Sequence, residues 1–323
     1  MTTGTSTPRI RGVLAPVLTP FDAGLKPDVA RFIGHANWLV DNNAGLAIFG
    51  TNSEAASLSV AERLELTDAL LAAGVPAGKM MPGTGACAIP DAVTLTRHAV
   101  DNGVAGCLML PPFFYKGVSD DGLFAYYSEV IERVGSDRLA VYLYHIPQMT
   151  HAPITLALIE RLLKRYPTVI AGAKDSSGDW ANSKAMIDAF AAQGFDVFPA
   201  SESFLSQSQA IGGAGSISAT VNVNPAGIHA LYAGWNGPDA ARLQASADVV
   251  RKIFTAFPMI PSMKATVARH TGHDGWSAVR PPLTRLEDTT RQALFEALDQ
   301  AGFAMPAGPM AGDRPDGKGQ SGG

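Results

Sequence analysis

The chain has little charge, little cysteine and no apolar run long enough to cross a membrane. Charged residues make up 17% of its 323 residues, and a formal net charge of −4 leaves no basic surface for nucleic acid or an anionic membrane. The two cysteines, Cys87 and Cys107, lie in small apolar contexts, so we expect buried thiols in a reducing compartment, the cytoplasm. Five of the seven histidines are scattered over helical patterns with no paired-carboxylate spacing, and no metal site is predicted. The sequence therefore favours a globular protein with neither nucleic acid nor membrane as partner.

Short β-prone apolar runs alternate with helical patterns along most of the chain. Apolar residues recur at helical spacing between the runs. Strict alternation implies a parallel sheet, and eight units imply an α/β fold closed into a (β/α)₈ TIM barrel with additional C-terminal helices. The predicted strands cover residues 12–18, 45–49, 79–81, 106–110, 139–144, 169–173, 196–200 and 215–219.

The pattern also divides the chain into segments. We predict a barrel at 9–236 and a helical extension packed on it at 237–304, because strand patterns stop while no linker intervenes. The ends, 1–8 and 305–323, are polar or rich in glycine and proline, and we predict that both are disordered.

The strand predicted at 169–173 ends on Lys174, an unusual place for an ammonium group. A continuous apolar run is buried on both faces, so a charge at its end is costly unless it is paired or deprotonated. One interpretation is a lysine that extends to water or pairs with Asp175. The other is an amine kept neutral by burial, which could attack a carbonyl and form a Schiff base.

Active sites of such barrels form where the strands end. Tyr144 ends the strand next to that of Lys174, and a phenol on the same cavity could move protons between nitrogen and oxygen. Thr51 and Asn52 lie in a turn after the second strand, where hydroxyl and N–H groups suit a carboxylate. His145, one position beyond the tyrosine, is predicted to point outward as a structural histidine.

A weaker motif, Gly212-Gly-Ala-Gly215, could suit a phosphate. Its spacing is not a dinucleotide fingerprint, and it precedes a strand instead of following one. A phosphosugar enzyme is therefore a minor alternative.

Several motifs in the same order resemble the pyruvate-dependent class I aldolases of the dihydrodipicolinate synthase and N-acetylneuraminate lyase type, over about residues 8–303. The resemblance implies that Lys174 forms an imine with pyruvate or another 2-oxo acid, and that Tyr144 relays protons. It implies no metal or organic cofactor, and a homo-oligomer, either a tetramer or a dimer. The motifs are Gly50-Thr-Asn-Ser-Glu54, Pro82-Gly-Thr-Gly85, Tyr144-His-Ile-Pro147, Gly172-Ala-Lys-Asp-Ser-Ser-Gly178 and Gly215-Ser-Ile-Ser218.

The same resemblance implies roles for further residues. Thr51 would face the tyrosine hydroxyl and, with Asn52, hold the carboxylate of the 2-oxo acid. Ala200 and Ile217 would line the pocket with backbone carbonyls.

Departures from the family pattern bear on the substrate. Met149 stands where the dihydrodipicolinate synthases carry an arginine for the second substrate's carboxylate, and methionine cannot form that ion pair. Phe114 stands where a neighbouring subunit supplies a tyrosine to the proton relay, with Tyr115 beside it. Ser176 and Glu202 match positions that bind sugar hydroxyls in the neuraminate lyases.

The predicted function is a lyase that makes or breaks a bond between a 2-oxo acid and an aldehyde, other than a strict lysine-pathway dihydrodipicolinate synthase. One alternative is a 2-keto-3-deoxy sugar acid dehydratase that uses the same imine. Another is a non-catalytic barrel that binds a 2-oxo acid.

Overall fold

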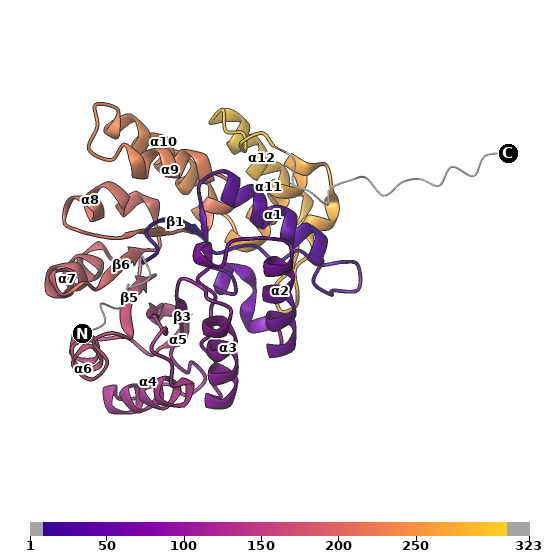
Figure 1. Ribbon diagram of the computed structural model, residues 1–323. Helices are drawn as coiled ribbons and strands as arrows, with labels where there is room; N and C mark the ends of the chain where they lie inside the picture. The colour runs from indigo at the N-terminus through magenta and orange to yellow at the C-terminus, as the bar shows by residue number, and fades with distance from the viewer. Residues whose placement is uncertain (1–8, 309–323) are drawn as a thin grey trace.

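The computed structural model describes residues 9–308, in which helices surround a ring of parallel strands (Figure 1). The strands are β1 (Gly12–Ala15), β2 (Gly45–Leu46), β3 (Cys107–Met109), β4 (Val141–His145), β5 (Ile170–Asp175), β6 (Asp196–Pro199) and β7 (Gly215–Ile217). The helices around them are α1 (Val29–Asp41), α2 (Val60–Ala72), α3 (Ile89–Asp101), α4 (Asp120–Val134), α6 (Leu156–Arg165), α7 (Trp180–Phe190), α8 (Leu205–Ala210) and α9 (Pro225–Ala233).

The strands close into a (β/α)₈ barrel, as the alternation predicted. Two parallel sheets run in the order β2-β1-β7 and β3-β4-β5-β6. The segment 80–83 joins them on one side, through bridges from Met80 to β2 and from Gly83 to β3, and so serves as the remaining strand. On the other side, the Ala214 N–H donates to the Val197 carbonyl at 3.0 Å and connects β7 to β6.

Glycine lets β7 approach β1 closely. At Gly215, which has φ of 147°, a Cβ atom would lie 1.8 Å from the Gly12 carbonyl oxygen. A Cβ on Gly213 would lie 2.0 Å from Ser208 Oγ. The motif considered for phosphate binding therefore lies where β7 begins, opposite the strand ends that form the site, and close packing accounts for these glycines.

Local sequence explains where the helices begin and which face they bury. Ser59 and Glu62 form the capping box expected at the start of α2, with the Ser59 N–H donating to Glu62 Oε2 at 2.8 Å. In α6 the buried residues recur at helical spacing, which fixes its apolar face against the barrel. They are Leu158, Ile159, Leu162 and Leu163.

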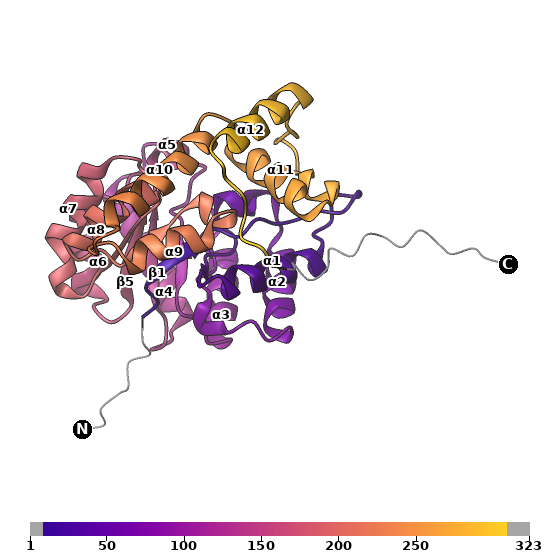
Figure 2. The same cartoon turned by 90° about the horizontal axis from the view of Figure 1, so that it is seen from above.

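Three further helices extend the barrel, in agreement with the predicted C-terminal helices. They are α10 (Ala240–Thr255), α11 (Met259–Thr271) and α12 (Asp288–Gln300). Figure 2 shows them on the same side as the short helix α5 (Pro147–Thr150), which follows the carboxyl end of β4. The extension therefore lies over the strand ends where a barrel builds its site.

The predicted start of the C-terminal tail is too early. Met305, placed in the predicted tail, is buried in the hydrophobic core, while segments 1–8 and 309–323 lie outside the described residues. Within residues 9–308, no helix is both long and apolar enough to cross a bilayer.

Two details of the sequence prediction were wrong. Cys107 is buried as expected, but Cys87 is exposed because it lies in the loop before α3 and not in a strand. The helix α9 had not been predicted, since Pro225 and Gly227 interrupt its pattern. Its proline occupies the first helical position, where the missing N–H costs nothing.

His35 makes the stability of the fold depend on pH. Its ring is fully buried, and Nε2 lies 3.1 Å from Asn222 Oδ1. Burial lowers the pKa of His35 from 6.5 to about 4. The unfolded chain therefore binds a proton between these values while the folded chain does not, so stability must fall as the pH falls from 6.5 to 4.

Between pH 7 and pH 4.5, we expect the free energy of unfolding of the wild type to fall by about 2–3 kcal/mol more than that of His35→Gln, as measured by urea unfolding. Glutamine can still donate to Asn222 but does not titrate. His151→Gln, a change at an exposed histidine, should keep the wild-type pH dependence. Equal losses in the wild type and His35→Gln would contradict the prediction.

Candidate active site

Lys174 and Tyr144 lie side by side at the carboxyl ends of β5 and β4. They are partners in the parallel register, so both side chains project to the same side of the sheet. Lys174 Nζ lies 3.2 Å from the Tyr144 hydroxyl, and both side chains are about 2% exposed. The strand pair thus brings a buried amine and a phenol within hydrogen-bond distance.

The surroundings of Tyr144 adjust its acidity. Burial alone raises the pKa of the phenol, but the Lys174 ammonium and hydrogen bonds from Thr51, Lys174 and Ser176 outweigh it, and the pKa lies below its usual value. Thr51 Oγ1 is 3.0 Å from the phenol oxygen. A phenol with a lowered pKa gives up its proton more readily, which suits a group that must both donate and accept protons.

The turn that carries Thr51 and Asn52 is held by its backbone. Residues Thr51–Ser53 form one turn of 3₁₀ helix, closed by Glu54 in the left-handed conformation at φ of 56°. Thr19 Oγ1 donates to the Ser53 carbonyl at 2.7 Å. The C-terminal end of the turn is therefore fixed beside the phenol.

A cavity of about 290 Å³ opens over Lys174. This volume is near the lower end of the range for small-molecule sites, which indicates a small ligand. Seven of the ten residues predicted for the site line it. They are Thr51, Asn52, Tyr144, Lys174, Ser176, Ala200 and Ile217.

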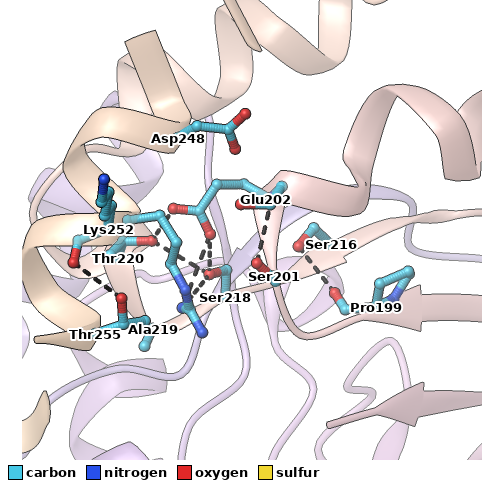
Figure 3. Close-up of polar contacts among 12 residues, drawn as sticks. Pro199, Ser201, Glu202, Ser216, Ser218, Ala219, Thr220, Asp248, Lys252 and Thr255 are labelled. Atoms are coloured by element: carbon cyan, nitrogen blue, oxygen red, sulfur yellow. Dashed lines mark hydrogen bonds and ion pairs between the residues drawn. The ribbon is translucent and has the colours of Figure 1, made fainter. Parts of the chain in front are cut away.

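The other three predicted residues do not line this cavity. Glu202 is fully buried, and its carboxylate accepts hydrogen bonds from Ser218 and Thr220 (Figure 3). Met149 lines a neighbouring apolar cavity of about 280 Å³, which shares Thr51 and Ile146 with the first.

Phe114 is 72% exposed, in an edge-to-face contact with Tyr115, which is 74% exposed. Both rings lie on the loop after β3. Neither ring lines the cavity over Lys174 within this single chain.

Among the polar residues of the cavity that the sequence analysis missed are Gln148 and Arg251. Gln148 comes from α5 and donates to the Ser176 carbonyl at 2.6 Å. Arg251 comes from α10, in the helical extension. The pattern of α10 identifies a helix with a buried face, but nothing in it indicates that this helix reaches the strand ends.

His145 has the structural role predicted for it. Its Nδ1 accepts a hydrogen bond from the Ile154 N–H at 3.0 Å. Burial lowers the pKa of His145, which favours the neutral ring that this bond requires.

Comparison with known proteins agrees with this geometry. Residues 9–301 match the model of the dihydrodipicolinate synthetase family. An uncharacterized DapA-like lyase of Chloroflexus aurantiacus is 34% identical over 295 residues, which cover 90% of this chain and 96% of the relative.

Solved structures show the same architecture. Dihydrodipicolinate synthase from Agrobacterium tumefaciens is 29% identical, with a TM-score of 0.83 over 90% of this chain and 99% of that one. A prophage protein of the dihydrodipicolinic acid synthase family from E. coli K12, solved in complex with pyruvate, is 25% identical, with a TM-score of 0.81 over 90% and 98% of the chains. With a lysine and a tyrosine paired at neighbouring strand ends of a (β/α)₈ barrel, the chain belongs to the dihydrodipicolinate synthetase family and is a lyase of the class I aldolase type.

Proposed function

We propose that this lyase forms a Schiff base between Lys174 and a 2-oxo acid, pyruvate being the simplest, and joins or cleaves a carbon–carbon bond to an aldehyde. The observation that carries the proposal is the buried amine of Lys174, 3.2 Å from the Tyr144 hydroxyl, at the wall of a small cavity. The pyruvate bound in the related E. coli protein supports the choice of 2-oxo acid.

In the first half of the reaction, the Lys174 ammonium gives up a proton, and the resulting amine attacks the C2 carbonyl of the 2-oxo acid and gives a carbinolamine. Tyr144 donates a proton to the departing hydroxyl, and water leaves as the imine forms. Thr51 keeps the phenol in place by the 3.0 Å contact and, with Asn52, holds the carboxylate. The fixed carboxylate directs C2 toward the amine.

In the second half, the Tyr144 phenolate takes a proton from C3, and the imine becomes an enamine because its nitrogen accepts the electron pair. The C3 carbon then attacks the aldehyde carbon, and the new alkoxide takes up the proton from Tyr144. Water hydrolyses the imine, releases a 4-hydroxy-2-oxo acid and restores the Lys174 amine. Cleavage runs through the same steps in reverse.

The imine is the electron sink, so the proposed reaction uses no further cofactor. We also propose a homo-oligomer, a tetramer or dimer, since family members are usually oligomeric and Phe114 and Tyr115 expose large aromatic surfaces. A cytoplasmic location stays a prediction.

Met149 supports a substrate other than that of the lysine pathway. It lies 57% exposed beside the apolar cavity and carries no charge for the carboxylate of a second substrate. A methionine in that place favours an aldehyde that is bound in another way.

Exchange of the pyruvate methyl protons tests the proposal without knowledge of the aldehyde. In heavy water, reversible enamine formation should replace these protons by deuterium, and proton NMR would show the methyl signal decrease in the presence of enzyme. A signal that decreases no faster than without enzyme would overturn the proposal.

Tyr144→Phe should slow this exchange by about 10²- to 10⁴-fold, because the general acid–base group is lost while the amine stays. Tyr142→Phe is the matched control, since Tyr142 is a buried phenol on the same strand that does not line the cavity. It should keep close to the wild-type rate. A Tyr144→Phe enzyme as fast as the control would exclude the phenol from the relay.

A further inference from the structure

A second cation shares the cavity with Lys174. Arg251 reaches it from α10, and its side chain is 19% exposed. No step proposed above uses this guanidinium. It comes from the helical extension and not from a strand end.

Buried groups at the ends of β6 and β7 hold the arginine. Arg251 Nη1 donates to Ser218 Oγ at 3.2 Å and lies 3.9 Å from Glu202 Oε2. Figure 3 shows Ser218 and Thr220 directed at the Glu202 carboxylate, to which both donate hydrogen bonds. Glu202 is thus occupied by these neighbours, which explains why it does not line the cavity.

The guanidinium keeps most of its hydrogen-bonding capacity. An arginine side chain offers five N–H donors, and within residues 9–308 a single side-chain hydrogen bond, from Nη1 to Ser218, uses one of them. The 3.9 Å separation from Glu202 places a compensating charge nearby without the paired hydrogen bonds of a bidentate contact. The remaining donors suit a planar or tetrahedral anion.

The acidic group of the cavity lining already has other hydrogen-bond partners. Asp175 is its one acidic lining residue in the described part of the chain. Both oxygens of that carboxylate are occupied, Oδ1 by the Ser177 N–H at 3.0 Å and Oδ2 by Ser183 at 2.6 Å. Arg251 therefore has no free carboxylate partner in the cavity, and an anionic ligand would supply one.

We propose that Arg251 binds an anionic group, a carboxylate or a phosphate, at the end of the substrate that enters as the aldehyde. This inference rests on the proposed function, which places the carboxylate of the 2-oxo acid at Thr51 and Asn52. The complete substrate then carries two anionic ends, one at that turn and one at Arg251. Glu202 is a positioning residue that holds the guanidinium through Ser218.

Matched aldehydes test the proposal. Wild-type enzyme and pyruvate are supplied with glyceraldehyde, glyceraldehyde 3-phosphate, propanal or succinic semialdehyde, and consumption of pyruvate gives kcat/KM. Glyceraldehyde 3-phosphate is compared with glyceraldehyde, and succinic semialdehyde with propanal. In at least one pair the anionic aldehyde should have a kcat/KM about 10- to 100-fold higher, as expected for one charge-assisted contact. The pair with the larger ratio shows whether the site prefers phosphate or carboxylate. Arg251→Gln should abolish that ratio, and Arg251→Lys, which keeps the charge for Glu202, should retain part of it.

Arg242→Gln is the control, because Arg242 lies exposed on the same helix and pairs with Asp239. It should keep the wild-type ratio. Equal kcat/KM for anionic and neutral aldehydes in the wild type would overturn the proposal. So would an unchanged ratio in Arg251→Gln, since the arginine would then only compensate the charge of Glu202.

A binding measurement separates this inference from the proposed function. Calorimetric titration compares 2-oxoglutarate and 2-oxoadipate with 2-oxo monoacids of equal length, and it needs no turnover. Tighter binding of a diacid that is lost in Arg251→Gln would support the anion site even if pyruvate formed no imine. No preference for either diacid, together with no preference for glyceraldehyde 3-phosphate, would exclude the site even if the imine forms.

Discussion

Lys174→Ala should slow exchange of the pyruvate methyl protons by at least about 10⁴-fold, because within residues 9–308 no other lysine lines the cavity to form the imine. Arg251, the other cation, carries a guanidinium whose charge is delocalised over its three nitrogens, so it cannot serve as the nucleophile. The loss should affect kcat and kcat/KM alike, since the covalent step is removed and not merely slowed.

Lys184→Ala is the matched control for this change. Lys184 belongs to α7, which follows β5, and its exposed ammonium pairs with Asp188 four residues later. The variant should exchange protons at the wild-type rate. A Lys174→Ala enzyme that keeps more than about a hundredth of the activity would show that the lysine is not the nucleophile.

Lys264→Met should destabilise the fold by about 3–5 kcal/mol, because it leaves the Glu54 carboxylate buried without its cation. Both side chains are fully buried, and Lys264 Nζ donates to Glu54 Oε1 and, at 2.7 Å, to the Ala278 carbonyl. Burial lowers the pKa of Lys264 to about 8, even though Glu54 opposes this shift.

The pair connects α11 to the turn that carries Thr51 and Asn52, since Glu54 closes that turn. Restoring neutrality with Glu54→Gln in the Lys264→Met background should recover most of the lost stability. Urea unfolding at one protein concentration measures both variants.

Arg285→Met serves as the comparison, because it removes an exposed pair with Asp274 and should cost no more than about 1 kcal/mol. If Lys264→Met were as mild as this surface change, the buried pair would not stabilise the extension on the barrel. A double variant no more stable than Lys264→Met would contradict charge compensation as the cause.

The sequence predicted the barrel because each strand and helix can be recognised from its own short stretch of residues. Each strand and helix carries its own apolar pattern, and the order of strand ends then placed Tyr144 beside Lys174. The prediction was weaker at the third strand, where the structure has a 3₁₀ turn at Ala77–Lys79 and only isolated bridges from Met80 and Gly83.

The substrate side of the site could not be predicted in the same way. Arg251 belongs to a helix whose position over the strand ends depends on tertiary packing, which no periodicity reports. Glu202 follows β6 as a site residue would, yet hydrogen bonds from Ser218 and Thr220 hold it away from the cavity lining. Chain order identified the strand ends but not the direction of each side chain there.

Borohydride trapping tests the central claim most directly. Wild-type protein is incubated with pyruvate, reduced, digested and mapped by mass spectrometry. The account predicts one reduced pyruvyl adduct, on the peptide that contains Lys174, and the same adduct in Lys184→Ala. No adduct, or an adduct on another lysine while Lys174 stays unmodified, would contradict it.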